Sequence, residues 1–334
     1  MRVRLRDRVV YAIARVAFAI ASRVPQWLGY GLARLLGRLY FRFDGRRRGY
    51  ALRFLRCAFP TASDAELRRI GARSTGNLFC VPLDMARLTR LLARGGSVRE
   101  VLDYTLAERQ LRSMKKPFLG LTAHLGNWEI AAIGVAQWAG GAHGIARVSK
   151  NPLLERWILG NRERGGLVIH PRRGGVRDLA KAMASGKVGL QVVDQNQRLR
   201  GVFAPFFGKL ASCERAAVTL ALRKGYPIVV GAALRRGGGF AFDLVAEEPF
   251  VLASTGDRAA DLAAGVRRVN AAIEALVRRA PEQYLWIHDR YRTQPREGDA
   301  GGEGDEGGTS GRVGDRDGAD GGVDAADFGD GGDD

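Results

Sequence analysis

From Pro117 onward, short apolar runs alternate with longer segments of helical periodicity, and this alternation restricts the fold more than any other feature. Apolar runs of about four to eight residues have the length of buried strands, whereas the segments between them repeat apolar positions every three to four residues. Strands that alternate with helices predict an α/β domain in which helices flank a mixed, largely parallel sheet. The predicted strands are 118–123, 144–148, 167–170, 188–193, 228–234 and 240–245, and the predicted helices are 128–138, 152–164, 176–185, 214–224 and 257–279.

Helix caps and turn residues mark further element boundaries. Ser63 and Glu66 have the spacing of a capping box, so a helix should begin there, and residues 50–115 should be mostly helical. Asn151, which precedes a proline, is a favourable helix start. The glycine run 237–239 predicts a turn between the last two strands.

The net charge of +18 hides two populations of opposite sign. Residues 297–334 carry 13 acidic side chains against two arginines, with 14 glycines, a composition typical of disorder. Residues 1–296 then hold 51 basic and 22 acidic side chains, a net charge of +29. Such a body attracts nucleic acid, anionic lipid or phosphorylated substrates, and charge alone does not distinguish them. We expect an anchoring helical segment over 1–48, an α/β domain over 49–296 and a disordered acidic, glycine-rich tail over 297–334.

The first 48 residues carry 12 arginines and only two acidic residues. No uncharged run reaches the ~18 to 20 residues of a spanning helix, and arginines interrupt the apolar region that a signal peptide needs. Val9, Ile13, Val16 and Ile20 recur at helical spacing, and Trp27 follows them. This pattern favours amphipathic, membrane-associated helices. A pair of ordinary core-packing helices and a short tilted span are the alternatives.

Cysteine and histidine usage argues against a metal or disulfide protein. Cys57, Cys80 and Cys213 are odd in number and far apart, which predicts a reducing compartment without a disulfide framework. The four histidines form no His-Glu-x-x-His pattern, and neither residue type lies at metal-ligand spacing. We therefore expect no structural zinc and no metal catalyst.

The loop after the first predicted strand carries the candidate chemistry. Residues five apart on a helix lie about 140° around its axis, so His124 and Glu129 meet only across a turn. Gly126 permits that turn, and Asn127 is a suitable cap for the next helix. A histidine oriented by a carboxylate is a general base for an alcohol, which can then attack an activated acyl group. Turn N–H groups or a nearby arginine would stabilise the oxyanion. A satisfied structural histidine is the alternative interpretation.

Four ordered blocks strengthen the catalytic interpretation. They are His-Leu-Gly-Asn-Trp-Glu at 124–129, Asp-Gln at 194–195, Gly-Val-Phe-Ala-Pro-Phe-Phe-Gly at 201–208 and Pro-Glu-Gln-Tyr-Leu-Trp-Ile-His at 281–288. In type and order they resemble the motifs of the late acyltransferases of lipid A biosynthesis, within the lysophospholipid acyltransferase superfamily. The resemblance covers roughly residues 5–295. Several blocks in order are far more specific than a single His/Glu pair.

This resemblance implies an O-acyltransferase of the cytoplasmic face of the bacterial inner membrane. It would move a fatty acyl chain from acyl carrier protein, or from acyl-CoA, to a hydroxyl of a phosphorylated lipid A-type glycolipid, with no metal or redox cofactor. His124 would be the general base and Glu129 its orienting carboxylate. The basic candidates would bind phosphate or pair with Asp194. The expected substrate-binding residues are Asn127, Arg147, Arg162, Arg164, Asp194, Gln195, Phe206 and Phe207.

Two of these motifs also have structural interpretations. Phe203, Phe206 and Phe207 could line an apolar acyl groove or simply belong to the core. Trp286 and His288 fit a C-terminal packing element better than a substrate site.

The acceptor and the general class stay open in part. Asp289 places a negative charge where many family members have a basic residue, which leaves another membrane glycolipid, such as a mannosylated phosphatidylinositol, as an alternative acceptor. A lipid-surface binding protein without catalysis is a second alternative. A nucleic-acid-binding module is disfavoured because the arginines are dispersed and no recognised motif accompanies them.

Overall fold

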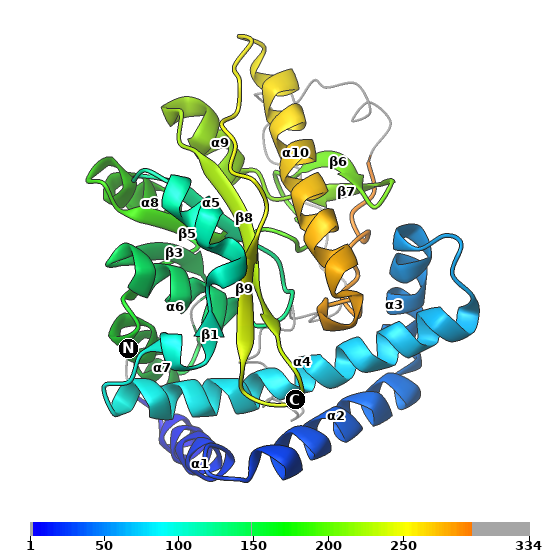
Figure 1. Cartoon of the computed structure of the whole chain (residues 1–334), viewed down its shortest axis with the longest axis vertical. Helices are drawn as coiled ribbons and strands as arrows, with labels where there is room; N and C mark the ends of the chain where they lie inside the picture. Colours follow the sequence, from blue (N-terminus) through cyan, green and yellow to red (C-terminus); the bar gives the residue numbers. More distant parts are fainter. Residues whose placement is uncertain (1–2, 148, 296–334) are drawn as a thin grey trace.

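The computed structural model describes residues 3–147 and 149–295, so the predicted tail at 297–334 lies outside the described residues. Its centre is a seven-stranded sheet in which every neighbouring pair is parallel except β8 and β9 (Figure 1). Helices flank this sheet, so the predicted α/β class is confirmed. In order across the sheet, the strands are β1 (Leu102–Asp103), β9 (Phe242–Ala246), β8 (Ile228–Arg235), β2 (Leu119–Thr122), β5 (Val188–Val192), β3 (Ala142–Ala146) and β4 (Leu167–Pro171).

The α-helices of the described chain agree with the sequence prediction to within two residues wherever both ends were predicted. Asn127 and Asn151 cap two of them through backbone N–H groups, and Ser63 and Glu66 form the predicted capping box. The helices are α1 (Leu5–Ala21), α2 (Gln26–Phe43), α3 (Gly45–Ala58), α4 (Asp64–Ala93), α5 (Glu108–Ser113), α6 (Trp128–Ala139), α7 (Pro152–Arg164), α8 (Gly175–Ala184), α9 (Ala216–Lys224) and α10 (Arg258–Arg279).

A separate two-stranded hairpin, which the sequence prediction missed, consists of β6 (Val202–Phe206) and β7 (Lys209–Cys213). Its aromatic residues pack around Phe54 of α3 together with residues from the end of the described chain. The sheet itself has a hydrophobic cluster on each face, because successive strand residues point to opposite sides. Ile228 and Val230 belong to one cluster and Val229 to the other.

The first four helices form a layer along one edge of the molecule, with α4 next to the domain and α1 and α2 outside it (Figure 1). Gly37 brings α2 very close to α4, since a Cβ there would lie 2.5 Å from the Thr75 carbonyl oxygen. The inner side of α2 is buried at Tyr30 and Phe41, whereas α1 has no buried residue. The segment 1–48 therefore combines a packing face with a large exposed face.

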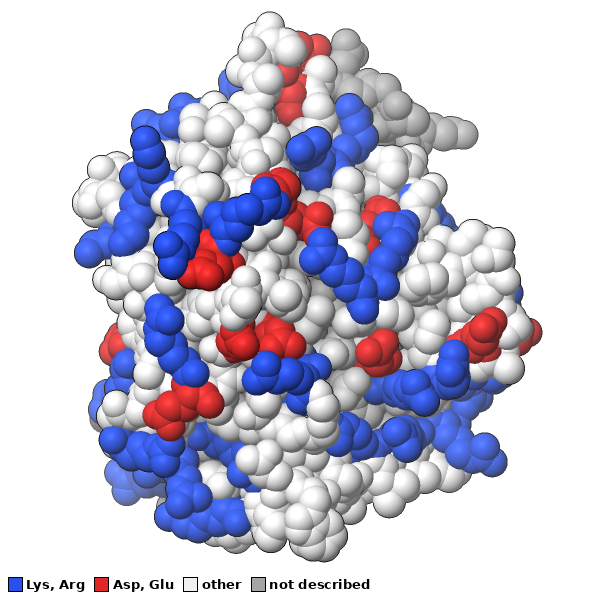
Figure 2. Space-filling view, viewed as in Figure 1, with Lys and Arg blue, Asp and Glu red and all other residues white. Residues whose placement is uncertain are grey.

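The exposed face of α1 and α2 is apolar and bordered by arginines. Figure 2 shows basic side chains gathered along this edge, with uncharged side chains between them. In the described part of the chain, no helix is both long enough and apolar enough to span a membrane. The exposed apolar residues are Leu5, Val9, Ile13, Val16 and Ile20 on α1, and Trp27, Leu28, Leu32, Leu35, Leu36, Leu39 and Phe43 on α2.

Candidate active site

The loop that follows β2 turns sharply at Gly126, as predicted. Gly126 has a φ of +61°, and a Cβ there would lie 2.1 Å from the Ala233 carbonyl oxygen. A side chain is therefore excluded both by conformation and by space. Asn127 then caps α6 by accepting hydrogen bonds from the N–H groups of Glu129 and Ile130. This turn leaves His124 at the carboxyl end of β2, where it is 6% exposed.

His124 is held by Asp194, which follows the neighbouring strand β5. The distance from His124 Nδ1 to Asp194 Oδ1 is 2.7 Å, and the His124 backbone N–H donates to Asp194 Oδ2 at 3.0 Å. Burial opposes ionisation of Asp194, but the charge of His124 and its hydrogen bonds outweigh burial and lower the pKa of Asp194 to about 2. An ionised Asp194 fixes the proton on Nδ1 and leaves the Nε2 lone pair available.

The structure places Glu129, which the sequence analysis expected to orient His124, beside Arg162. Glu129 lies in the first turn of α6 and forms an ion pair with Arg162 of α7, whose Nε donates to Glu129 Oε2 at 2.9 Å. Both side chains are largely buried, with 11% and 16% of their surfaces exposed. The sequence analysis also allowed one of the predicted arginines to pair with Asp194, and no such contact is found among the described residues. Asp194 contacts His124, while Arg164 donates to Asn161 Oδ1.

Gln195, which the sequence predicted to contact substrate, lies beside Nε2 of the His124 imidazole. Its Nε2 is 3.3 Å from His124 Nε2, so with the proton on Nδ1 the amide donates to the Nε2 lone pair. The backbone N–H groups of residues 124–127 all have acceptors within the protein, namely Asp194, Ala123, Gln283 and Ala233. Those backbone groups are therefore engaged, whereas the Gln195 amide is a side-chain donor beside Nε2.

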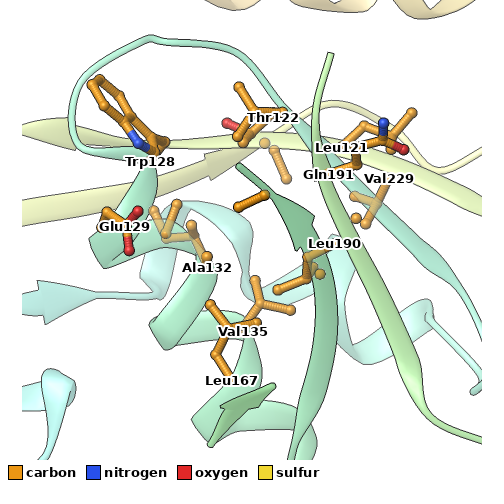
Figure 3. Close-up of a pocket in the computed structure, with 18 of the residues that line it drawn as sticks. Leu121, Thr122, Trp128, Glu129, Ala132, Val135, Leu167, Leu190, Gln191 and Val229 are labelled. Carbon is orange, nitrogen blue, oxygen red and sulfur yellow. The ribbon is translucent and has the colours of Figure 1, made fainter. Parts of the chain in front are cut away.

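An apolar cavity of about 100 Å³ lies between α6 and the sheet, and its lining includes Thr122, Trp128 and Glu129, which flank the His124 loop. Glycines on three strands contribute to its lining, Gly120 of β2, Gly144 of β3 and Gly231 of β8, because small residues there leave space under the helix. Glu129, Ala132 and Val135 of α6 face this space, with Trp128 and Thr122 nearby (Figure 3). The cavity is therefore apolar inside, and its polar lining includes the Glu129–Arg162 pair.

A buried network of hydrogen bonds and an ion pair also supports the His124 loop. Asn127 Nδ2 donates to Asp84 Oδ2 of α4 at 2.9 Å, and the Tyr30 hydroxyl of α2 donates to Asp84 Oδ1 at 2.7 Å. Arg235 at the end of β8 forms an ion pair with Asp84, with Nη1 at 3.0 Å from Oδ1. Burial alone would lower the pKa of Arg235, but the Asp84 carboxylate reverses this and raises it. Asn127, which the sequence predicted to bind substrate, is fully buried, and both atoms of its amide are engaged within the protein.

Residues 281–288 hydrogen-bond to the His124 loop and support it, which the sequence analysis did not anticipate. Leu285 N–H donates to the His124 carbonyl at 3.0 Å, and Gly126 N–H donates to the Gln283 carbonyl at 3.0 Å. Burial, followed by the charge of Asp194, raises the pKa of Tyr284. Burial also lowers the pKa of His288 to about 4, so its neutral ring accepts from the Asn196 N–H. Together, these residues add both backbone and side-chain support to the catalytic loop.

The remaining predicted site residues divide into core and surface. Phe206 and Phe207 are 0% and 4% exposed and both pack against Phe54, as the core interpretation expects. Arg147 lies in the loop before α7 and Arg164 is the last residue of α7, and both are exposed.

Sequence comparisons add an independent observation. Residues 3–293 match the family described as bacterial lipid A biosynthesis acyltransferase. The chain is also similar to the lipid A biosynthesis lauroyltransferase of Escherichia coli strain K12, with 27% identity over 293 residues, covering 83% of this chain and 89% of that protein. Within the described residues, we find no group of three or more His, Cys, Asp or Glu side chains that could hold a metal ion.

Proposed function

This chain belongs to the bacterial lipid A biosynthesis acyltransferase family, and from that premise we propose that it transfers a fatty acyl chain from a thioester donor to a hydroxyl of a lipid A-type glycolipid. The observation that carries this proposal is the buried Asp194–His124 pair, 2.7 Å apart, beside an apolar cavity. A general base next to an apolar slot is what an alcohol and an acyl thioester need. The donor is acyl carrier protein or coenzyme A carrying the acyl group, and no further cofactor takes part.

In the proposed reaction, His124 Nε2 removes the proton from the acceptor hydroxyl as its oxygen attacks the thioester carbonyl. The ionised Asp194 stabilises the imidazolium that forms. The acceptor hydroxyl displaces the Gln195 amide from Nε2, and that amide then donates to the developing oxyanion. Collapse of the tetrahedral intermediate breaks the carbon–sulfur bond, and the imidazolium proton passes to the leaving thiolate. An ester and a free thiol result.

The cavity under α6 is the proposed site of the acyl chain. Its lining is almost entirely apolar, so a hydrocarbon chain leaves water on entering it. The Glu129–Arg162 ion pair borders this space, where the thioester end of the donor would lie. We therefore assign Arg162 to donor binding and Glu129 to holding its guanidinium in place.

The exposed apolar face of α1 and α2 is the proposed membrane contact. Its apolar side chains and neighbouring arginines match a helix pair that lies in the interface of an anionic membrane. The loop of His124 is joined to α4, and therefore to the same layer, through Asn127 and Asp84. This arrangement supports the proposal that the protein acts at the cytoplasmic face of the inner membrane, where it can reach lipid acceptors.

The decisive test is a transfer assay with the full chain and anionic vesicles. Acyl carrier protein or coenzyme A thioesters would be supplied with vesicles containing either lipid A precursors or mannosylated phosphatidylinositols, and the products identified by mass spectrometry. We expect an ester product with the lipid A precursor, none with His124→Ala, and flotation of the protein with the vesicles. Transfer only to the other glycolipid would refute the acceptor, and equal transfer by His124→Ala would refute the mechanism.

Acyl chain length should follow the volume of the cavity. Ala132 and Val135 both face it from α6, so Ala132→Phe should shift the preferred donor to a shorter chain, by about two to four carbons. Val135→Ala, the matched change in the opposite direction, should keep or lengthen that preference. Relative kcat/KM across a series of donors measures both effects. An identical length profile for Ala132→Phe and the unchanged protein would place the acyl chain elsewhere.

A further inference from the structure

Exposed cations gather on loops at the carboxyl ends of three neighbouring strands. Strands β5, β3 and β4 are adjacent and parallel, so the loops that follow them lie at one edge of the sheet. These loops span 194–201, 147–151 and 172–174, and Asp194, which is buried against His124, is the one acidic residue in their sequences. Their exposed basic side chains are Arg147, Lys150, Arg172, Arg173, Arg198 and Arg200.

The described chain ends against one of these loops. Thr293 donates its N–H to Asn196 Oδ1 at 3.2 Å, and its hydroxyl accepts from Asn196 Nδ2 at 3.0 Å. The same hydroxyl donates to the Gln197 carbonyl at 3.1 Å. The adjacent Gln195 is the residue that contacts His124 Nε2. The described chain therefore ends beside the loop that carries Arg198 and Arg200.

We propose that residues 297–334 dock on the cationic loops around the active site and compete there with anionic substrates. Three observations support this occupant: its net charge of −11, the net charge of +29 on the rest of the chain, and the contact of Thr293, near the end of the described chain, with the 194–201 loop. Opposite charges at short range attract strongly at low ionic strength. The competition part of the proposal rests on the proposed function, whereas the docking part does not.

The length of the segment suits this docking. A glycine-rich chain of 38 residues has a root-mean-square span of roughly 35 Å, which is enough to reach all three loops from residue 295. Tethering raises its local concentration to the millimolar range, so weak individual contacts suffice. Its acidic residues are spread along the segment and separated by glycines, which lets them meet cations on separate loops.

Docking can be measured without any activity. A fluorescent peptide of residues 297–334 would be titrated against the full chain in which all 13 tail acids are changed to Asn or Gln. We expect binding at low salt that weakens at least tenfold when Arg172, Arg173, Arg198 and Arg200 are also changed to Gln. The control changes four exposed cations near the amino ends of the strands, Lys181, Lys187, Arg223 and Lys224, and should alter binding less than threefold. Equal losses for the two sets, or no binding at low salt, would overturn the docking.

Competition is then read from steady-state kinetics. At low salt, neutralising the 13 tail acids in the full chain should lower KM for the anionic substrate about three- to tenfold with little change in kcat. A shuffled tail that keeps its acids should behave like the natural one, and about 0.5 M salt should remove the difference. If the peptide binds the loops but no variant transfers acyl groups, the proposed function fails and docking stands. If transfer occurs and neutralisation leaves KM unchanged, competition is refuted, and the loops serve a partner such as an acidic carrier protein instead.

Discussion

Asp194→Asn should reduce kcat for acyl transfer by roughly 10³- to 10⁴-fold, as loss of the orienting carboxylate does in other histidine-based sites. The asparagine amide would donate to His124 Nδ1 and hold the imidazole in the wrong tautomer, with its proton on Nε2. That nitrogen could then no longer accept the acceptor hydroxyl's proton. KM should change much less than kcat, because Asp194 is buried behind the imidazole at 4% exposure. Initial rates at saturating donor and acceptor provide the measurement.

The low pKa of Asp194 predicts how stability and the transfer rate depend on pH. The folded-state pKa of Asp194 is about 2, below its ordinary value of 3.8, so its ionisation stabilises the fold above pH 3.8 and this contribution is lost as the pH falls through 2. Asp194 therefore stays ionised across the assay range and should contribute no step to the rate profile.

Glu129→Gln is the matched comparison, since it removes the carboxylate that the sequence favoured. The amide holds the Arg162 guanidinium less strongly than the carboxylate does. We therefore expect kcat/KM to fall by at most about 10²-fold, mainly through a higher KM for the donor. A variant Asp194→Asn with more than a tenth of the original kcat, beside an inactive Glu129→Gln, would restore Glu129 as the orienting residue.

Asp84→Ala should lower the free energy of unfolding by about 3–5 kcal/mol, because it strands the buried Arg235 guanidinium without its counter-charge. The Asp84 side chain is fully buried and that of Arg235 is 5% exposed. The change also removes acceptors from Tyr30 and Asn127, and with them the support of the catalytic loop. Urea unfolding followed by circular dichroism gives the free energy, and transfer assays on the folded fraction give the effect on the loop.

A double-mutant cycle tests this explanation. Asp84→Ala combined with Arg235→Ala leaves no uncompensated charge, so it should cost clearly less than the sum of the single changes. Arg109→Ala, which breaks the exposed Arg109–Glu248 pair and leaves Glu248 as the acceptor of Gln110, should have almost no effect on stability. Additive single changes would mean that the ion pair is not the reason for the loss.

The sequence predicted the fold well because the α/β pattern is local. Helix periodicity, the Asn127 and Asn151 caps and the glycine turns each act within a few residues. The hairpin β6–β7 was missed because Pro205 and neighbouring phenylalanines mask the alternation of a strand. The position of strand 144–148 was also displaced by two residues, since the small residues at its true start carry little hydrophobic signal.

The catalytic pair was only half predictable for the opposite reason. Glu129 was chosen because it is five residues from His124, whereas the actual partner is 70 residues away and is brought close by the pairing of β2 with β5. A signal was present, since Asp194 also follows a buried strand and so lies at the same sheet edge as His124. Asp84 gave less warning, because it is a single acid within a long helix.

The dependence of the His124 loop on the last described residues has a consequence for biogenesis. The loop is held by backbone bonds to Gln283 and Leu285, and His288 and Thr293 fasten the segment that carries Gln195. On the ribosome, every earlier part of the active site emerges before these residues do. We therefore expect a nascent chain to lack the assembled active site until the residues that support the His124 loop and Gln195 have been synthesised.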